Sequence, residues 1–160
     1  MSDATPEFLG GGCLCGAVRY RVRPENREGY YCHCRMCQLA FGNTRVPFLN
    51  LPKGSVQWES EPNYHASSRF ARRGFCARCG TPLSFEYTDS ARMDIAVGSL
   101  DDPSAITPTS HFAIESRVAN WHVDDGLPGN RLDESEKLRA RWKKHYGEGV
   151  VPGAAATREP

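Results

Sequence analysis

The sequence lacks any apolar run that approaches the roughly 18 residues needed to span a membrane. It also lacks an excess of charge, because 20 lysines and arginines face 19 aspartates and glutamates, for a net charge of +1. This balance argues against a general electrostatic grip on nucleic acid or anionic lipid, so we predict neither nucleic acid nor membrane as a partner. The first twelve residues contain no basic segment and no apolar stretch, so we expect no secretory signal and a cytoplasmic location.

A chain of 160 residues is the size of one domain. We expect that domain at residues 11–147, with flexible ends at 1–10 and 148–160, where the chain is polar or rich in glycine, proline and alanine. No repeat or charge pattern predicts an oligomeric state.

Between these ends the pattern mainly predicts strands. Val18, Tyr20 and Val22 alternate with arginines, which is the period-two pattern of a half-buried strand. Turn residues separate further candidate strands at 44–49, 55–58, 64–70, 83–87, 93–97 and 110–118.

One late segment has the pattern of a helix. Asp133 could cap it, with Glu136 as the capping-box partner, and Gly147 would end it. Leu138 and Trp142 would share one face of this helix, so we expect it to pack on a sheet.

Cysteine is scarce for a disulfide scaffold, yet its seven residues are the most informative feature. Seven is an odd number, and without an export signal clustered cysteines favour metal ligands or redox thiols over disulfides. They fall into three groups, Cys13 with Cys15, then Cys32, Cys34 and Cys37, then Cys76 with Cys79.

The number of thiolates in each group suggests two different zinc sites. Two pairs make a closed four-thiolate site, although spacing alone does not decide which groups pair. We pair Cys13 and Cys15 with Cys76 and Cys79 as ligands of a structural zinc, because both pairs look like turns that lead into strands. Glycines follow both pairs, as suits tight metal-binding turns. A redox disulfide is the alternative, but Pro82 disfavours the helix that a thioredoxin-like Cys76–Cys79 motif needs.

The remaining three cysteines leave one position of a tetrahedral zinc open, which is how catalytic zinc sites are built. Residues 35–42 favour a short helix, so Cys32 or Cys34 would lie near its N-terminus, where a thiolate is stabilised. That environment suits a metal ligand, and also a metal-free nucleophilic or redox thiol. We expect His33, between two ligands, to face away from the metal.

These motifs resemble the glutathione-dependent formaldehyde-activating enzyme family, which includes the centromere protein V domain. The resemblance covers about residues 10–130. It rests on three segments, Gly12-Cys13-Leu14-Cys15-Gly16-Ala17-Val18, Cys32-His33-Cys34 with Cys37, and Phe75-Cys76-Ala77-Arg78-Cys79-Gly80-Thr81-Pro82-Leu83. Gly98-Ser99-Leu100-Asp101-Asp102-Pro103 and Trp121 fit the same pattern.

The resemblance implies a mainly β fold of the β-tent (Mss) type, with antiparallel sheets, zinc knuckles and here a C-terminal helix. It implies two zinc ions per chain, a structural one on Cys13, Cys15, Cys76 and Cys79 and a reactive one on the catalytic cysteines Cys32, Cys34 and Cys37. The implied activity is that of a carbon–sulfur lyase acting on an adduct of formaldehyde with glutathione, S-hydroxymethylglutathione. The chain is shorter between its motifs than the glutathione-active members, so the resemblance predicts zinc binding better than substrate identity.

Two other functions remain open from the sequence. One is a zinc-scaffolded thiol carrier or protein-interaction module without catalysis, and the other is a metal-free redox protein. For a lyase, a small thiol substrate such as glutathione would enter the triplet site as its fourth ligand. Arginines suit its carboxylates, and the candidates are Arg35, Arg45, Arg69, Arg72, Arg73 and Arg117. Asn120 and His122 are candidate pocket residues, and Trp121 is expected in the core.

Overall fold

The structure is a computed structural model and describes residues 7–150. Within that range the chain is mainly β, with two α-helices. The strands are β1 (Leu9–Gly12), β2 (Arg19–Val22), β3 (Glu28–Cys32), β4 (Val46–Pro52), β5 (Val56–Trp58), β6 (Asn63–Ser68), β7 (Ala71–Phe75), β8 (Pro82–Tyr87), β9 (Arg92–Ala96), β10 (Thr107–Phe112) and β11 (Gly129–Asn130), and the helices are α1 (Arg35–Phe41) and α2 (Glu136–Tyr146).

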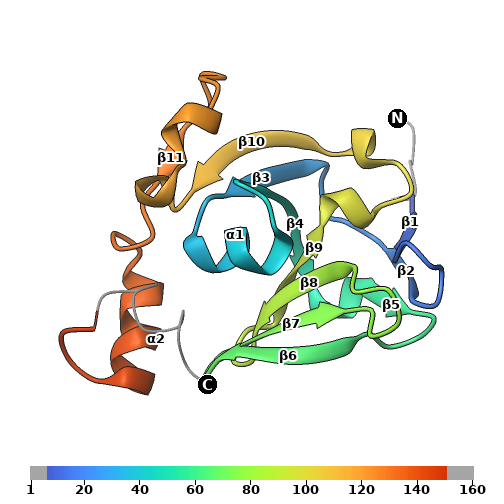
Figure 1. The fold of residues 1–160 in the computed structure, drawn as a ribbon. Helices are drawn as coiled ribbons and strands as arrows, with labels where there is room; N and C mark the ends of the chain where they lie inside the picture. The colour runs from blue at the N-terminus through green and yellow to red at the C-terminus, as the bar shows by residue number, and fades with distance from the viewer. Residues whose placement is uncertain (1–6, 151–160) are drawn as a thin grey trace.

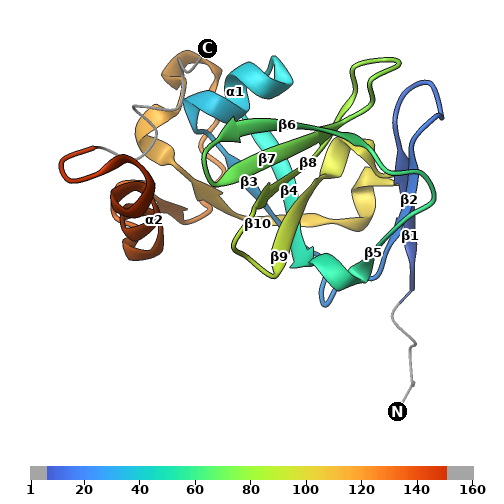
Figure 2. The same cartoon turned by 90° about the horizontal axis from the view of Figure 1, so that it is seen from below.

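The strands form two sheets. A small sheet has the order β1-β2-β5, and a large sheet has the order β11-β10-β3-β4-β9-β8-β7-β6. Figures 1 and 2 show the small sheet at one side of the molecule and α2 at the opposite side. The predicted mainly β architecture is confirmed, although β10 pairs in parallel with β3 and β11, so the large sheet is mixed.

The main core lies between the two sheets. Tyr20 and Val22 from β2 are fully buried in one cluster with Leu49 from β4 and Ile95 from β9. Along β2, Tyr20 and Val22 alternate with Arg19 and Arg21, as the period-two pattern predicted. The core therefore fixes one face of the large sheet and leaves the other face to build the site.

Strand register places a row of four side chains on that second face. Asn50 of β4 pairs with Asp94 of β9, Asp94 pairs with Phe85 of β8, and Phe85 pairs with Arg73 of β7. Directly opposed residues of antiparallel strands point to the same side of the sheet. The four side chains therefore form one polar and aromatic row across the sheet.

A second row runs beside the first. Tyr30 of β3 pairs with Phe48 of β4, which pairs with Ala96 of β9. Cys32 follows Tyr30 by two residues and so shares its face. The group of Cys32, Cys34 and Cys37 thus begins at the end of a strand that also carries a tyrosine toward the same space.

The two helices differ in how well their predicted boundaries hold. Helix α1 matches the expected segment, because Cys34 is its N-cap and Gly42, at φ 60°, is its C-cap. Helix α2 begins later than expected, because Ser135 rather than Asp133 caps it by accepting from the Leu138 amide. The Asp133 carboxylate is instead bonded to Arg131, at 2.7 Å for its closest pair of atoms.

The predicted strand at 110–118 is wrong in its second half. Strand β10 ends at Phe112 because Ala113 adopts a left-handed backbone conformation with φ 58°. Two short 3-10 turns follow, Ile114–Ser116 and Ala119–Trp121. The strands β1, β3, β7 and β11 were not predicted.

The expected flexible ends at 1–10 and 148–160 lie largely outside the described residues, where they stay predictions. Strand β1 already begins at Leu9, and α2 ends at Tyr146. Neither helix in residues 7–150 has the length and apolar character to cross a membrane.

Candidate metal centres and the adjoining cavity

Two cysteine pairs that are distant in the sequence meet in space. Cys13 and Cys15 lie in the loop between β1 and β2, Cys76 and Cys79 lie between β7 and β8, and all four sulfur atoms are within 4.8 Å of one another. The Sγ–Sγ distance is 3.6 Å from Cys13 to Cys15 and 3.8 Å from Cys15 to Cys76. Tetrahedral zinc with Zn–S bonds of about 2.3 Å separates its sulfurs by about 3.8 Å, so this donor set fits zinc.

Each pair sits on a tight turn that ends in glycine. The Gly16 amide donates to the Cys13 carbonyl at 3.1 Å, and the Gly80 amide donates to the Cys76 carbonyl at 2.8 Å. Both glycines have φ +80°, a conformation that a side chain would strain. The turns therefore bring the two thiols of each loop toward the thiols of the other loop.

The three remaining cysteines form a second group at the start of α1. The sulfur atoms of Cys32, Cys34 and Cys37 also lie within 4.8 Å of one another. Cys34 Sγ accepts from the Cys37 amide at 3.3 Å, as an N-cap does. Hydrogen bonds from Cys32 and Cys37 hold the pKa of Cys34 well below its usual range, which favours the thiolate form of Cys34.

A buried arginine lies against this triad. Arg73 is 7% exposed, and its Nη1 and Nη2 both lie 3.5 Å from Cys37 Sγ, with the guanidinium 4.7 Å from the centre of the Phe85 ring. No carboxylate among residues 7–150 lies within ion-pair distance of Arg73. A buried cation requires a counter-charge, so the triad itself supplies the negative charge that Arg73 needs.

His33 faces away from the triad, as expected. It is buried, and its Nε2 lies 2.7 Å from His111 Nδ1, while His111 Nε2 lies 3.0 Å from the Asp125 carboxylate. The Asp125 carboxylate accepts from His111 Nε2, so His33, His111 and Asp125 form a hydrogen-bonded chain. Burial lowers the pKa of His33 to about 4, so the ring is neutral and orders the backbone between two cysteines.

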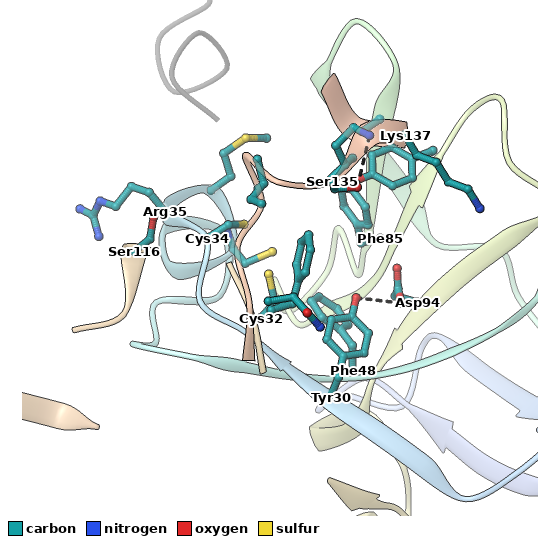
Figure 3. Close-up of a pocket in the computed structure, with 18 of the residues that line it drawn as sticks. Tyr30, Cys32, Cys34, Arg35, Phe48, Phe85, Asp94, Ser116, Ser135 and Lys137 are labelled. Atoms are coloured by element: carbon teal, nitrogen blue, oxygen red, sulfur yellow. Dashed lines mark hydrogen bonds between the residues drawn. The ribbon is translucent and has the colours of Figure 1, made fainter. Parts of the chain in front are cut away.

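A cavity of about 650 Å³ opens beside the triad and not beside the four-cysteine group. All three triad cysteines line it, together with Tyr30, Asp94 and Arg73 from the face of the large sheet. Leu138 and Trp142 of α2 line its other side. Figure 3 shows Cys32 and Cys34 turned toward the same space as Tyr30 and Phe85.

One buried carboxylate in this cavity was missed by the sequence analysis. Asp94 is 6% exposed, and its Oδ1 accepts from the Tyr30 hydroxyl at 3.0 Å and from Asn50 Nδ2 at 3.1 Å. Burial raises the pKa of Asp94 to about 6, although these two hydrogen bonds lower it. An acidic residue inside the otherwise apolar run Met93–Val97 was the signal in the sequence.

The structure separates the arginine candidates. Arg35 and Arg73 line the cavity, whereas Arg72 is paired with Glu86 and Arg45 lies over the Tyr31 ring at 4.2 Å. Arg69 donates to the His145 carbonyl at 3.0 Å. Arg117 lines a small separate recess.

The loop residues expected near a pocket do not line the large cavity. Asn120 is exposed, and His122 lies beside His33 and His111 with ring centroids 6.1 and 5.6 Å away. Trp121 was expected in the core, but it lies in a surface 3-10 turn and is 70% exposed. That expectation was wrong, because the short turn Ala119–Trp121 holds the indole ring at the surface.

A family model described as glutathione-dependent formaldehyde-activating enzyme matches residues 8–116 of this chain. The chain belongs to this family. The match includes all seven cysteines, Arg73 and Asp94, and it ends before α2. The predicted resemblance is thus confirmed over most of its expected span.

The chain is also similar to two individual proteins. The chain is 37% identical over 84 residues to a protein named an uncharacterized lyase from Schizosaccharomyces pombe, across 52% of this chain and 61% of that protein. The matched part thus spans about three fifths of that relative. A crystal structure of a Rhodobacter sphaeroides protein has the same fold, with a TM-score of 0.51 and 17% identity over 76% of this chain and 99% of that one.

Proposed function

We propose that this protein is a zinc-dependent carbon–sulfur lyase that cleaves or forms a small thiol–aldehyde adduct of the S-hydroxymethylglutathione type. The observation that carries the proposal is the difference between the two cysteine groups. Four thiols gather within 4.8 Å of one another and do not line the cavity, whereas three thiols line a cavity of about 650 Å³. Family membership and the lyase name of the relative support the same reaction class.

In this proposal, Cys13, Cys15, Cys76 and Cys79 hold a structural zinc, and Cys32, Cys34 and Cys37 hold a reactive one. The reactive zinc, when bound, would stabilise the sulfur of a small thiol as thiolate. Three thiolates more than neutralise the two positive charges of the ion, so this role suits the site better than strong carbonyl activation. Arg73 would offset the remaining negative charge of such a site from its position at Cys37.

Glutathione is the proposed thiol. Its carboxylates need cationic partners, and the exposed side chains of Arg35 and Lys137 both line the cavity. The cavity volume also falls in the range of small-molecule sites.

The proposal is tested by exchange NMR on a mixture of formaldehyde and glutathione at equilibrium. Protein with two zinc ions per chain should speed the interconversion of free and S-hydroxymethyl glutathione, and the Cys34→Ser variant should not. Zinc content near two without any rate increase, for glutathione or simpler thiols, would favour the non-catalytic thiol carrier. Absence of metal in protein purified without chelator would favour the redox alternative.

A further inference from the structure

The carboxylate of Asp94 is held by one of its two oxygens. Tyr30 and Asn50 both donate to Oδ1, at 3.0 and 3.1 Å. Oδ2 has no hydrogen-bond partner among residues 7–150, and it is not among the fully enclosed polar atoms that lack one. Figure 3 shows the Asp94 carboxylate on the cavity side of the sheet, with one oxygen bonded to Tyr30. A fixed carboxylate therefore presents one unpaired oxygen to the cavity that the triad lines.

The position of Asp94 follows from the fold. Tyr30 pairs with Phe48 on β4, and Asn50 of β4 pairs with Asp94. The row of Tyr30 and Phe48 therefore lies between the backbone of Cys32 and that of Asp94. The Tyr30 ring spans this gap, since its hydroxyl reaches Asp94 while its backbone precedes Cys32 by two residues. The site thus places a sulfur-binding group on one side and a hydrogen-bonded carboxylate on the other.

We propose that Asp94 is the proton-transfer residue of this site. The inference rests on the lyase function proposed above, and it names the group that serves the oxygen of the adduct. In the cleavage direction, Asp94 Oδ2 accepts the hydroxyl proton of the adduct. The O–H electron pair becomes the second bond of the carbonyl, the C–S bond breaks, and its electron pair stays on sulfur as thiolate. In the reverse direction the thiolate attacks the carbonyl carbon, and Asp94 returns the proton to oxygen.

The surroundings of Asp94 suit both directions. The carboxyl has a pKa of about 6, so near neutral pH it both takes and returns a proton readily. Hydrogen bonds from Asn50 and Tyr30 and the charge of Arg92 on β9 lower this pKa, while the charge of Cys37 on α1 raises it. Tyr30 and Asn50 donate to Oδ1, whereas Oδ2 transfers the proton. The hydrogen bonds therefore orient the carboxylate without blocking Oδ2.

The experiment is steady-state and exchange kinetics of the zinc-loaded full chain carrying Asp94→Asn. We expect kcat to fall by about 10²–10⁴-fold, with KM changed less than about threefold and zinc content unchanged. Asp94→Glu, which restores a carboxylate, should recover part of the rate. The matched control is Asp101→Asn, an exposed carboxylate bonded to Arg19 in the other half of the molecule, which should behave as wild type.

A second variant keeps the test decisive if Asp94→Asn loses its fold. The cleavage rate of wild type should rise with pH through the Asp94 pKa. Asn50 is exposed, and its hydrogen bond lowers that pKa, so Asn50→Ala should shift the rise to higher pH. Full activity in Asp94→Asn, or an unmoved pH profile in Asn50→Ala, overturns the role of Asp94 alone. A wild-type protein that does not accelerate the exchange overturns the lyase function and, with it, this role.

Discussion

Asp94 is a buried carboxylate whose ionisation lowers the stability of the fold. Asp94 has a pKa of about 6 in the folded protein against 3.8 as its ordinary value. The folded state therefore binds this proton more tightly than the unfolded state. The stabilisation that the fold gains from binding this proton is fully present below pH 4 and is lost as the pH rises through about 6. At neutral pH the ionised group costs the fold on the order of 3 kcal/mol relative to its protonated form.

Asp94→Asn should consequently be more stable than wild type at pH 7.5, by about 1–2 kcal/mol. The amide oxygen still accepts from Tyr30 and Asn50, and no charge is buried. The advantage should shrink toward zero near pH 4, where wild-type Asp94 is protonated. Urea unfolding at both pH values measures this difference. A variant less stable than wild type at pH 7.5 would contradict the account of Asp94 as a destabilising charge.

Arg73 supports a second prediction about a single residue. Its guanidinium is buried against Cys37, and the triad is its only anionic neighbour within the described chain. Arg73→Met removes a counter-charge to the triad, and loss of such a supporting contact weakens metal binding by about 10–100-fold. Chelator competition should therefore release one zinc per chain much earlier than in wild type. Arg72→Met, at the adjacent exposed position paired with Glu86, should release zinc as wild type does.

Residue types and spacing predicted the cysteine groups but not Asp94 or Tyr30. Close cysteine pairs are recognisable from the local sequence, because each turn must direct two thiols at one metal ion. Asp94 becomes informative only when the register sets it opposite Asn50 and Phe85, with Tyr30 reaching across from β3. That juxtaposition depends on strand order, which a single sequence does not reveal.

At the scale of elements, periodicity was informative where one face of a strand is buried. β2, β8 and β9 lie near their expected positions, whereas β7, with two consecutive arginines and a glycine, has no such pattern. Burial does alternate over its first three residues, because Ala71 and Arg73 are buried and Arg72 is exposed, but the residue types do not reveal it. Arg73 is buried against the triad, and only the tertiary structure brings β7 and α1 together.

Helix α2 lines one side of the cavity, although it lies outside the part of the sequence that matches the family model. Its buried face, Leu138 and Trp142, packs on Phe70, with the Trp142 and Phe70 ring centroids 5.4 Å apart. The matched segment ends at residue 116, so this wall of the cavity is contributed by a different part of the chain. We therefore expect α2 to affect substrate binding more than the chemistry at the triad.

Trp142→Ala should separate these effects. The lost aromatic packing is expected to cost about 3–5 kcal/mol locally, which loosens α2 from the sheet. KM should rise at least severalfold while zinc content stays at two. Hydrogen exchange of α2 amides together with kinetics measures this, and Lys144→Ala, exposed on the same helix, is the matched control. An unchanged KM with a loosened helix would show that α2 does not contribute to binding.

For the whole molecule, the two cysteine groups should differ in what their loss does. The four-cysteine group joins the β1–β2 loop to the β7–β8 loop, whereas the triad lies within six consecutive residues. Structural zinc contributes an apparent 10–16 kcal/mol in small zinc-binding peptides, which rivals the whole stability of a domain of about 5–15 kcal/mol. Loss of the first group should therefore unfold the protein, and loss of the second should not.

Seven single cysteine-to-serine variants test this difference by thermal unfolding and zinc content. Unfolded or insoluble protein is expected for Cys13, Cys15, Cys76 and Cys79. Folded protein with one zinc and no lyase activity is expected for Cys32, Cys34 and Cys37. If the triad variants unfold as readily as the others, both groups are structural and the lyase proposal loses its main physical support.

The sequence distance between the two halves of the four-cysteine group also sets an order of events during synthesis. Cys15 and Cys76 are 61 residues apart, so at about 5–20 residues per second the first pair waits roughly 3–12 s for the second. The triad is complete during that interval, since all three of its cysteines precede Cys76. We therefore expect the nascent chain to bind metal at the triad first. The four-cysteine group, which joins the β1–β2 loop to the β7–β8 loop, would bind its metal only afterwards.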